Sequence, residues 1–300
     1  MDKISVVENM QKYLEQYGKE ESFSMERLYN SVGYTKRHAD RLFREFLHMT
    51  PAEYLRAVRL SQSARELVET DKSVLEVALD HHYATHEGYT RAFEEQFSAT
   101  PQAYRKGKKP IPLFMPSPVS HYYILLNQKE RTDMEEKTIL CTTSAVERPK
   151  RKLILLRAKK ATDYFSFCEE CGCDWYGLLD SISSKLDAPG LITLPPFLMK
   201  EGYTSTACGV EVPFDYEGEV PEGYELVELP ACTMLYFQTE PFEREEDFPV
   251  AIGLVFSALD RYDFKRYGYV RADEDAPLYN FGFSAAKGAS LAVAVRRVNR

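Results

Sequence analysis

The sequence predicts a multidomain protein in which an all-α domain with two helix-turn-helix units precedes an α+β domain with an antiparallel sheet. Three observations predict this fold class. The fourteen residues RLFREFLHMTPAEY (41–54) return fifty positions later as RAFEEQFSATPQAY, with six positions identical. The segment GKKPIPLFMPSP (107–118) contains four prolines and marks a boundary. Beyond it, helical spacing of apolar residues gives way to short strand-like segments. The expected parts are a helical domain at 1–107, a linker at 108–137 and an α+β domain at 138–300.

Composition and charge describe a globular protein whose two regions differ. The 300 residues are 44% hydrophobic and 28% charged, which is typical of a soluble domain with a core. No stretch approaches the roughly 18 apolar residues that span a bilayer, and the start lacks the apolar segment of a secretory signal. We therefore expect a cytoplasmic protein without membrane contact. Residues 1–109 hold 17 Lys and Arg against 17 Asp and Glu, so the net charge of −8 belongs to residues 110–300.

The helical domain is built from two copies of one motif. In each copy a short helix, at 24–34 and again at 73–83, precedes the repeated block, with Ser24 and Ser73 as expected N-caps. A turn and a second helix follow, and each block contains a Thr-Pro pair that suits the start of another helix. This order, found twice, is that of two helix-turn-helix units. The apolar residues of 52–70 predict a helix between them, which at roughly 1.5 Å per residue would hold the two units about one DNA turn apart.

Residues 5–106 resemble the DNA-binding domain of the AraC/XylS family of bacterial transcription regulators. The resemblance is carried by GYTKRHADRLFREF (33–46), PAEYLRAVRL (51–60), AREL (64–67), VLEVAL (74–79) and YTRAFEEQFSATPQAYRK (89–106). It implies double-stranded DNA and RNA polymerase as partners, and recognition helices that begin at Thr35 and Thr85. Two positions depart from the family pattern, because Tyr29 replaces a small residue and His82 stands where the turn often has glycine. An alternative stays open, in which the repeat is only a packing motif of a helical domain that binds no DNA.

We expect DNA contacts from eight residues, of which seven are carried over position by position from the resemblance and one, Lys36, belongs to the densest group of basic residues. They are Lys36, Arg37, Asp40 and Arg41 in the first recognition helix, and His86, Glu87, Thr90 and Arg91 in the second. Arginine is the usual reader of guanine O6 and N7, whereas a carboxylate accepts from cytosine N4 but repels phosphate. We therefore expect selectivity with moderate general affinity. Arg41 and Arg91 each stand four residues before a glutamate, Glu45 or Glu95, so an intrahelical ion pair is the alternative role for them.

The second region alternates strands with helical stretches in the order strand, helix, two strands, found about twice. This order predicts an α+β architecture of duplicated strand-helix-strand-strand units with antiparallel sheet. The expected helices are 161–186 and 247–263. The expected strands are 138–146, 152–158, 205–213, 224–230, 232–240, 278–284 and 290–298.

This region resembles the GyrI-like, or effector-binding, domain found behind some AraC-type DNA-binding domains. The resemblance is carried by YFSFCEECGCDWYGLL (164–179), GVEVPFDYEGEVPEGYELVELPACTMLYFQTEPF (209–242) and RYGYVRADEDAPLYNFGF (266–283). It implies a cleft between two halves, lined by aromatic side chains, that takes small molecules, often cationic or lipophilic. The candidate effector-binding residues are Cys171, Trp175, Glu211, Tyr236, Phe256, Tyr279 and Phe281.

Two features leave the ligand class open. Members of the resembled family often carry a buried glutamate that pairs with a cationic ligand, but residues 276–280 read APLYN, without an acid. Glu211 is the best substitute, and strand alternation points it away from Val210 and Val212, either into the cleft or, as we expect, to solvent. Trp175 lies on a helix face that either lines the cleft or forms ordinary core.

The sequence predicts a ligand-responsive transcription regulator, not an enzyme, whose effector is small and aromatic or lipophilic. No Ser–His–Asp arrangement, phosphate-binding loop or HExxH motif is found. The alternative is a small-molecule hydrolase, in which Glu211 beside Tyr236 or Tyr279 would supply acid–base chemistry. A module that sequesters a toxic compound is a third possibility.

The six cysteines are expected to be reduced thiols in a cytosolic chain. Cys168, Cys171 and Cys173 resemble half of a structural zinc site, but such a site takes four ligands, commonly in two close pairs, and no second close pair follows. We therefore expect small buried side chains, with no metal and no cofactor. A metal site or a redox sensor is the alternative for this cluster.

Overall fold

The helical part of the chain comes first in the computed structural model, which describes residues 3–18, 20, 23–107, 109–119, 140–242, 247–284 and 287–298. The chain divides into two compact units, Met1–Arg131 and Thr132–Arg300. The first unit contains α1 (Lys3–Tyr17), α2 (Met25–Val32), α3 (Lys36–Leu47), α4 (Pro51–Glu69), α5 (Val74–Asp80), α6 (His86–Phe97) and α7 (Pro101–Gly107). Among the residues described, no helix is long and apolar enough to cross a bilayer.

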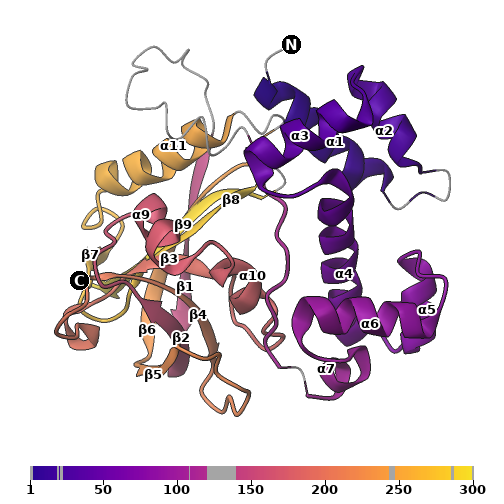
Figure 1. Ribbon diagram of the computed structural model, residues 1–300. Coiled ribbons are helices and arrows are strands. Elements are labelled where there is room, and N and C mark those ends of the chain that lie inside the picture. Colours follow the sequence, from indigo (N-terminus) through magenta and orange to yellow (C-terminus); the bar gives the residue numbers. More distant parts are fainter. Residues whose placement is uncertain are drawn as a thin grey trace. The chain divides into compact units, whose positions relative to one another are not determined.

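Helix α4 is the rod between the two helix-turn-helix units. Figure 1 shows α1–α3 at one end of α4 and α5–α7 at the other. The rod starts with a capping box, because Thr50 Oγ1 accepts from the Glu53 N–H at 3.2 Å and the Glu53 carboxylate accepts from the Thr50 N–H at 2.7 Å. Ser24, Ser73 and Thr100 accept in the same way from the backbone N–H three residues on. The helix expected at 52–70 and the N-caps expected at Ser24 and Ser73 are confirmed, and Thr50 and Thr100 of the two Thr-Pro pairs cap the helices that follow them.

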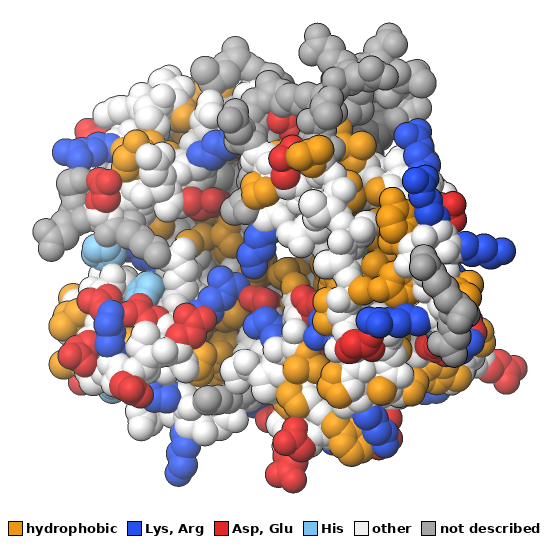
Figure 2. Space-filling view, turned by 180° about the vertical axis from the view of Figure 1, so that it is seen from behind, with side chains coloured by type: hydrophobic (Ala, Val, Ile, Leu, Met, Phe, Trp, Pro, Cys, Tyr) orange, Lys and Arg blue, Asp and Glu red, His pale blue; other side chains and the backbone are white. Residues whose placement is uncertain are grey.

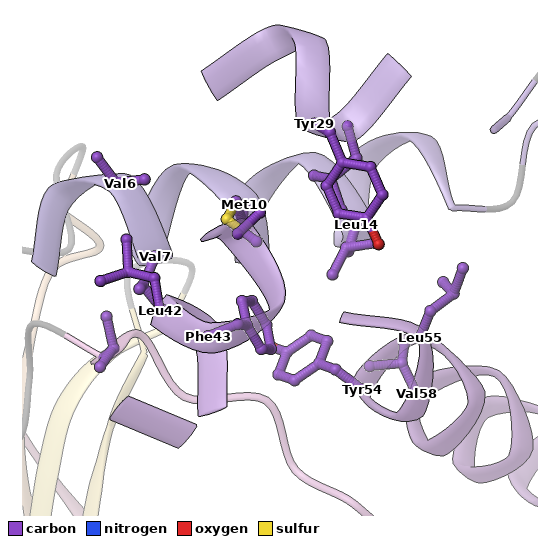
Figure 3. Packing of buried hydrophobic residues seen from close by; sticks show 13 residues of the cluster. Val6, Val7, Met10, Leu14, Tyr29, Leu42, Phe43, Tyr54, Leu55 and Val58 are labelled. Atoms are coloured by element: carbon purple, nitrogen blue, oxygen red, sulfur yellow. The ribbon is translucent and has the colours of Figure 1, made fainter. Parts of the chain in front are cut away.

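Each helix-turn-helix unit has its own core, and α4 contributes to both. Near the start of α4 the Tyr54 ring packs edge-on against Phe43, with the centroids 5.5 Å apart (Figure 3). Near its end a second cluster holds Phe93 and Tyr104, whose ring centroids are 5.8 Å apart. The identical residues of the repeat therefore include equivalent core positions, which is why large rings recur there.

Residues 109–119, called the strap below, pack against the helical unit. Ile111 is buried in the core around Phe93, and the Phe114 ring lies edge-on to Tyr54 at 5.1 Å. The Gln11 side chain also holds the strap, since Nε2 donates to the Ser117 carbonyl and Oε1 accepts from the Val119 N–H, each at 2.9 Å. The described part of the expected linker therefore packs on the helical unit, because apolar side chains between its prolines enter the cores of that unit. Residues 120–137 of that segment lie outside the described residues.

The second unit is an antiparallel sheet with helices. Its strands are β1 (Cys141–Arg148), β2 (Arg151–Arg157), β3 (Gly190–Thr193), β4 (Thr206–Pro213), β5 (Glu225–Leu229), β6 (Cys232–Thr239), β7 (Tyr269–Arg271), β8 (Leu278–Ser284) and β9 (Gly288–Arg297). Its described helices are α9 (Tyr164–Cys171), α10 (Trp175–Asp180) and α11 (Phe248–Arg261), with a 3₁₀ turn at Pro196–Leu198. The strand order is β1-β6-β9-β8-β3-β4-β2-β5, with β7 paired to β9.

Two similar halves make up this sheet. In the first half β2 leads through α9 and α10 to β3 and β4, and in the second β6 leads through α11 to β8 and β9. The halves meet where β3 pairs with β8 and Ile192 stands opposite Tyr279. This arrangement confirms the α+β fold class with duplicated strand-helix-strand-strand units. The single helix expected at 161–186 is wrong: Gly172, at φ 84°, ends α9, and α10 begins three residues later.

The two faces of the sheet carry different side chains. On the helix face, Ile154 and Val210 pack with Phe167 and Trp175 of the α9–α10 region. Strand pairing turns Phe237 of β6 to this face, and there its ring packs against Tyr262 at the end of α11. The opposite face, called the aromatic face below, carries a second apolar cluster that includes Leu153, Ile192, Tyr236, Tyr279 and Phe281.

Candidate DNA interface and effector site

The candidate DNA interface consists of α3 and α6, the second helices of the two helix-turn-helix units. The turn before α3 contains Gly33 at φ 71°, and the turn before α6 contains His82 at φ 62°. His82 therefore adopts the left-handed backbone for which glycine is usual, a conformation that is uncommon for other residues. Thr85 caps α6 by accepting from the Gly88 N–H at 3.0 Å. Thr35 is the equivalent N-cap residue of α3, but its side chain makes no capping hydrogen bond.

Three of the four candidates on α3 are available to a ligand. Lys36, Arg37 and Arg41 are exposed. Asp40 is instead partly buried and accepts a hydrogen bond from the Tyr29 hydroxyl at 3.0 Å, which ties α3 to α2. Burial and the adjacent carboxylate raise the pKa of Tyr29 to about 12. The unusual Tyr29 and the acid at position 40 therefore form a pair, and its evident role is to hold the helix rather than to read cytosine.

On α6 the candidates also divide. His86, Glu87 and Arg91 are exposed. The Thr90 hydroxyl oxygen is buried and has no hydrogen-bond partner among the described residues. Thr90 thus turns its polar atom inward, so the expectation that this hydroxyl reads a base edge does not fit the structure. The family resemblance had assigned this position to DNA contact, and a resemblance in sequence does not show which way a hydroxyl points.

Arg41 is not used by the intrahelical pair that was its alternative role. Glu45 accepts instead from Lys3 Nζ at 2.9 Å, and Arg41 Nη2 lies 3.4 Å from His38 Nδ1. Figure 2 shows Lys and Arg side chains interspersed with Asp and Glu over the visible face of the molecule. Residues 1–109 hold equal numbers of acidic and basic residues, so the position of a few arginines matters more for DNA binding than overall charge does.

The candidate effector site is a set of residues on the aromatic face, called the sheet-face cluster below: Tyr236, Tyr279, Phe281, Glu211, Arg148, Arg151 and Asp187. Its three rings form a parallel stack. Phe281 lies between the tyrosines, 5.8 Å from the Tyr236 centroid and 5.4 Å from that of Tyr279, with interplanar angles of 5° and 6°. Tyr279 is buried, whereas Tyr236 and Phe281 are half-buried. The accessible part of the stack is therefore the Tyr236–Phe281 end.

A buried ion pair lies at the inner end of this stack. Arg151 Nε is 2.7 Å from Glu211 Oε2, and the Tyr279 hydroxyl donates to Glu211 Oε1 at 2.7 Å. Arg151 is 0% exposed and Glu211 is 4% exposed. Burial lowers the pKa of the Arg151 guanidinium, but the hydrogen bond and charge of Glu211 outweigh it and leave that pKa raised. Burial, helped by the Glu211 charge, raises the pKa of Tyr279.

The expectation that Glu211 faces solvent is wrong. Pairing of Leu153 with Glu211 across β2 and β4 turns this carboxylate to the aromatic face, where Arg151 compensates its charge. The ion pair with Arg151 involves the same carboxylate that the sequence suggested as the acid–base group of a hydrolase. This arrangement argues against recognition of a cationic ligand by Glu211, because Arg151 already pairs with that carboxylate.

A second ion pair lies nearer to solvent. Arg148 Nη2 and the Tyr236 hydroxyl both donate to Asp187 Oδ2, each at 2.7 Å. Sequence reasoning missed Arg148, Arg151 and Asp187. One signal was present for Arg151, which alternates with Leu153 and Leu155 along an apolar strand. The register that brings it to Glu211 is a long-range property.

The other effector candidates lie elsewhere. Trp175, 5% exposed, packs edge-on against Phe167 at 6.1 Å, and Cys171 joins the same cluster on the helix face. Phe256 is on α11, the helix of the helix face, and is 38% exposed. Of the seven candidates, the structure thus brings together Glu211, Tyr236, Tyr279 and Phe281. No group of His, Cys, Asp or Glu that could hold a metal ion occurs among the described residues.

The cysteines depart from the expectation of small buried side chains. Cys208 is buried, but Cys168, Cys171, Cys141 and Cys232 are half-buried, and Cys173 is exposed. Cys173, the exposed one, follows the Gly172 turn that ends α9.

Comparison with known proteins places the helical unit among transcription regulators. A family model described as a helix-turn-helix domain matches residues 28–107. The chain is 35% identical over 103 residues to the probable transcription factor PqrA of Proteus vulgaris, covering 34% of this chain and 84% of PqrA. It is 32% identical over 109 residues to the transcriptional regulator Rob of Salmonella typhimurium, covering 36% of this chain but only 37% of Rob. A solved structure of SAV2435 bound to tetraphenylphosphonium matches 52% of this chain and 94% of that one, at 10% identity and a TM-score of 0.34, which supports no statement on ligand.

Proposed function

Because the chain belongs to the AraC family of transcription regulators, we propose that it binds specific DNA sequences through α3 and α6 and responds to a small molecule through the sheet unit. One observation carries the first part: Arg41 and Arg91 occupy the same position of the repeat, and both are exposed on second helices. Helix α4, which lies between the two helix-turn-helix units, is 19 residues long. At about 1.5 Å per residue its length is about 28 Å, which is near the roughly 34 Å of one DNA turn. RNA polymerase is a further proposed partner, on family membership alone.

We expect Arg41→Ala and Arg91→Ala each to weaken binding to a selected duplex by about 5- to 150-fold, because a well-placed arginine contact with guanine contributes about 1–3 kcal/mol. The measurement is fluorescence anisotropy with a sequence selected from a random duplex library by the unaltered chain. Loss of a phosphate contact should lower the slope of log affinity against log salt concentration by about one. Loss of a base contact should instead relax the sequence preference at one position of the duplex.

Arg297→Ala is the matched control, because it removes the same charge from an exposed position of β9. Its affinity for the duplex should stay unchanged. If neither α3 nor α6 variant differs from this control, DNA recognition by these helices is refuted.

For the sheet unit we propose a neutral, planar aromatic effector that stacks on the Tyr236–Phe281 end of the sheet-face cluster. Parallel rings with one accessible end favour a further flat ring. The two acids, Glu211 and Asp187, are matched by Arg151 and Arg148 at 2.7 Å each, so the cluster has no spare negative charge for a cation. Such an effector changes DNA affinity only if it binds the DNA-competent and incompetent states unequally. Sequestration without regulation is the competing proposal, and it predicts binding with no change in DNA affinity.

A pair of compounds with the same ring system, one neutral and one cationic, tests the proposed ligand class. We expect the neutral compound to bind more tightly in calorimetry, and Phe281→Ala to weaken its binding about tenfold through the lost ring contact. Phe256→Ala removes an exposed ring from the helix face and should leave affinity unchanged. Tighter binding of the cation, or equal losses in both variants, would contradict the proposed site.

A further inference from the structure

Arg41, one of the two arginines proposed to read DNA, is held at the surface of α3 by His38. Arg41 Nη2 lies 3.4 Å from His38 Nδ1, which is the only hydrogen-bond partner of this arginine side chain among the described residues. Residues three apart in sequence are neighbours on a helix surface. A guanidinium can only donate, so Nδ1 accepts, and the ring proton of His38 is on Nε2. The contact thus keeps the Arg41 side chain on one side of α3.

The His38 ring is itself held by Tyr34, in the turn before α3. The two rings are stacked, with their centroids 4.5 Å apart and an interplanar angle of 5°. Tyr34 packs against the core of the first helix-turn-helix unit, and its N–H donates to the Tyr29 carbonyl at 3.2 Å. Both stacked rings are half-buried, whereas Arg41 is exposed. A chain of contacts therefore leads from the core through Tyr34 and His38 to the guanidinium of Arg41.

The second helix-turn-helix unit lacks this support. Fifty residues after Tyr34 and His38 the chain has Ala84 and Gly88, which offer neither a ring nor a hydrogen-bonding side chain. The side chain of Arg91 makes no hydrogen bond or ion pair with any residue that the structure describes. The two arginines at the equivalent position of the repeat therefore differ in how firmly they are held before DNA binds.

We propose that His38 is a positioning residue for DNA reading by Arg41, so that the first helix-turn-helix unit discriminates among bases more strictly than the second. The inference rests on the proposed binding of DNA through α3 and α6. An arginine that is already held loses less rotamer freedom when it binds, and its bidentate contact with guanine O6 and N7 requires a defined direction. Arg91, without an equivalent of His38, loses more of that freedom and is less strictly directed to one base.

The test measures the affinity of the full chain for the selected duplex and for each of its single-base-pair variants, by fluorescence anisotropy. We expect His38→Ala to weaken binding to the selected duplex about 2- to 10-fold, because Arg41 must then be ordered during binding. The sequence preference should relax at the base pair where Arg41→Ala relaxes it, and it should stay unchanged at the base pair that Arg91→Ala identifies. His38→Gln should recover most of the loss, because its side-chain carbonyl can accept from the guanidinium.

The double variant His38→Ala/Arg41→Ala separates positioning from direct contact with DNA. If His38 acts through Arg41, the double variant should bind no more weakly than Arg41→Ala alone. Losses that add, or a preference that relaxes at a different base pair in His38→Ala, would show that His38 contacts DNA itself and would overturn the proposal.

The single variants keep this proposal distinct from the function on which it rests. A normal loss in Arg41→Ala with none in His38→Ala, or an equal loss on every duplex with unchanged preference, would refute the positioning role alone. If Arg41→Ala bound the duplex as well as Arg297→Ala does, DNA reading by α3 would be refuted as well, because His38 would have no contact to position.

Discussion

Glu211→Gln is expected to lower the free energy of unfolding of the sheet unit by about 3–5 kcal/mol. The substitution keeps the shape of the side chain and its hydrogen bond with Tyr279, but it removes the only carboxylate at 2.7 Å from Arg151 among the described residues. Arg151 is fully buried, and its Nη1 donates to two neutral partners, the carbonyls of Pro230 at 2.8 Å and Pro149 at 3.4 Å. A guanidinium left in this position without a counter-charge bears most of its desolvation cost.

Trp175 fluorescence during urea unfolding measures this effect, because the only tryptophan of the chain lies in the sheet unit. Asp187→Asn is the matched control: it breaks the other ion pair of the cluster, to Arg148, whose members are 14% and 29% exposed, so it should cost much less. The double variant Arg151→Met/Glu211→Gln should recover most of the loss, since it leaves neither charge of this buried pair without its partner. Equal losses for Glu211→Gln and Asp187→Asn would show that burial of Arg151 is not what sets the cost.

The helical unit was largely predictable because its signals are local. Ser24, Thr50, Ser73 and Thr100 each bond a backbone N–H three residues away, and the turn before α3 has its glycine at position 33. Such contacts are encoded within one turn of helix, so the sequence displays them directly. The effector site was predictable only in part, because its members meet through strand register.

Trp175 illustrates why the other part failed. Helical spacing placed it on one long helix at 161–186, which Gly172 divides into α9 and α10, and spacing cannot tell which face of a sheet a helix covers. For Glu211, strand alternation correctly predicted that its side chain points away from that of Val210. Only the pairing of β2 with β4 shows that Arg151 lies on the same face of the sheet and pairs with it. The described strap, 109–119, is a related case, since its prolines predicted the absence of a helix but carried no information on its packing against the helical unit.

Phe93→Ala is expected to destabilise the second helix-turn-helix unit by about 3–5 kcal/mol, because it empties the centre of a close-packed core. Phe93 is fully buried, with the rings of Tyr89, Phe97 and Tyr104 at 5.7, 4.7 and 5.8 Å. Hydrogen exchange read by mass spectrometry is the appropriate measurement, since the helical unit has no tryptophan. Amides of α5–α7 should exchange about 100-fold faster or more, and those of α1–α3 much less so, because Phe43 and its separate core are untouched.

The comparison of the two ends decides how the repeat works. Glu95→Ala, an exposed position two residues from Phe93, should change stability by no more than about 0.5 kcal/mol and leave exchange unaltered. Phe43→Ala should give the mirror pattern, with faster exchange in α1–α3. If either phenylalanine variant accelerates exchange equally at both ends of α4, the two cores melt as one cooperative body. Helix α4 would then transmit unfolding between the two cores, and loss of α3 or α6 would entail loss of the other. Independent exchange at the two ends would instead allow one of these helices to leave the DNA while the other stays bound.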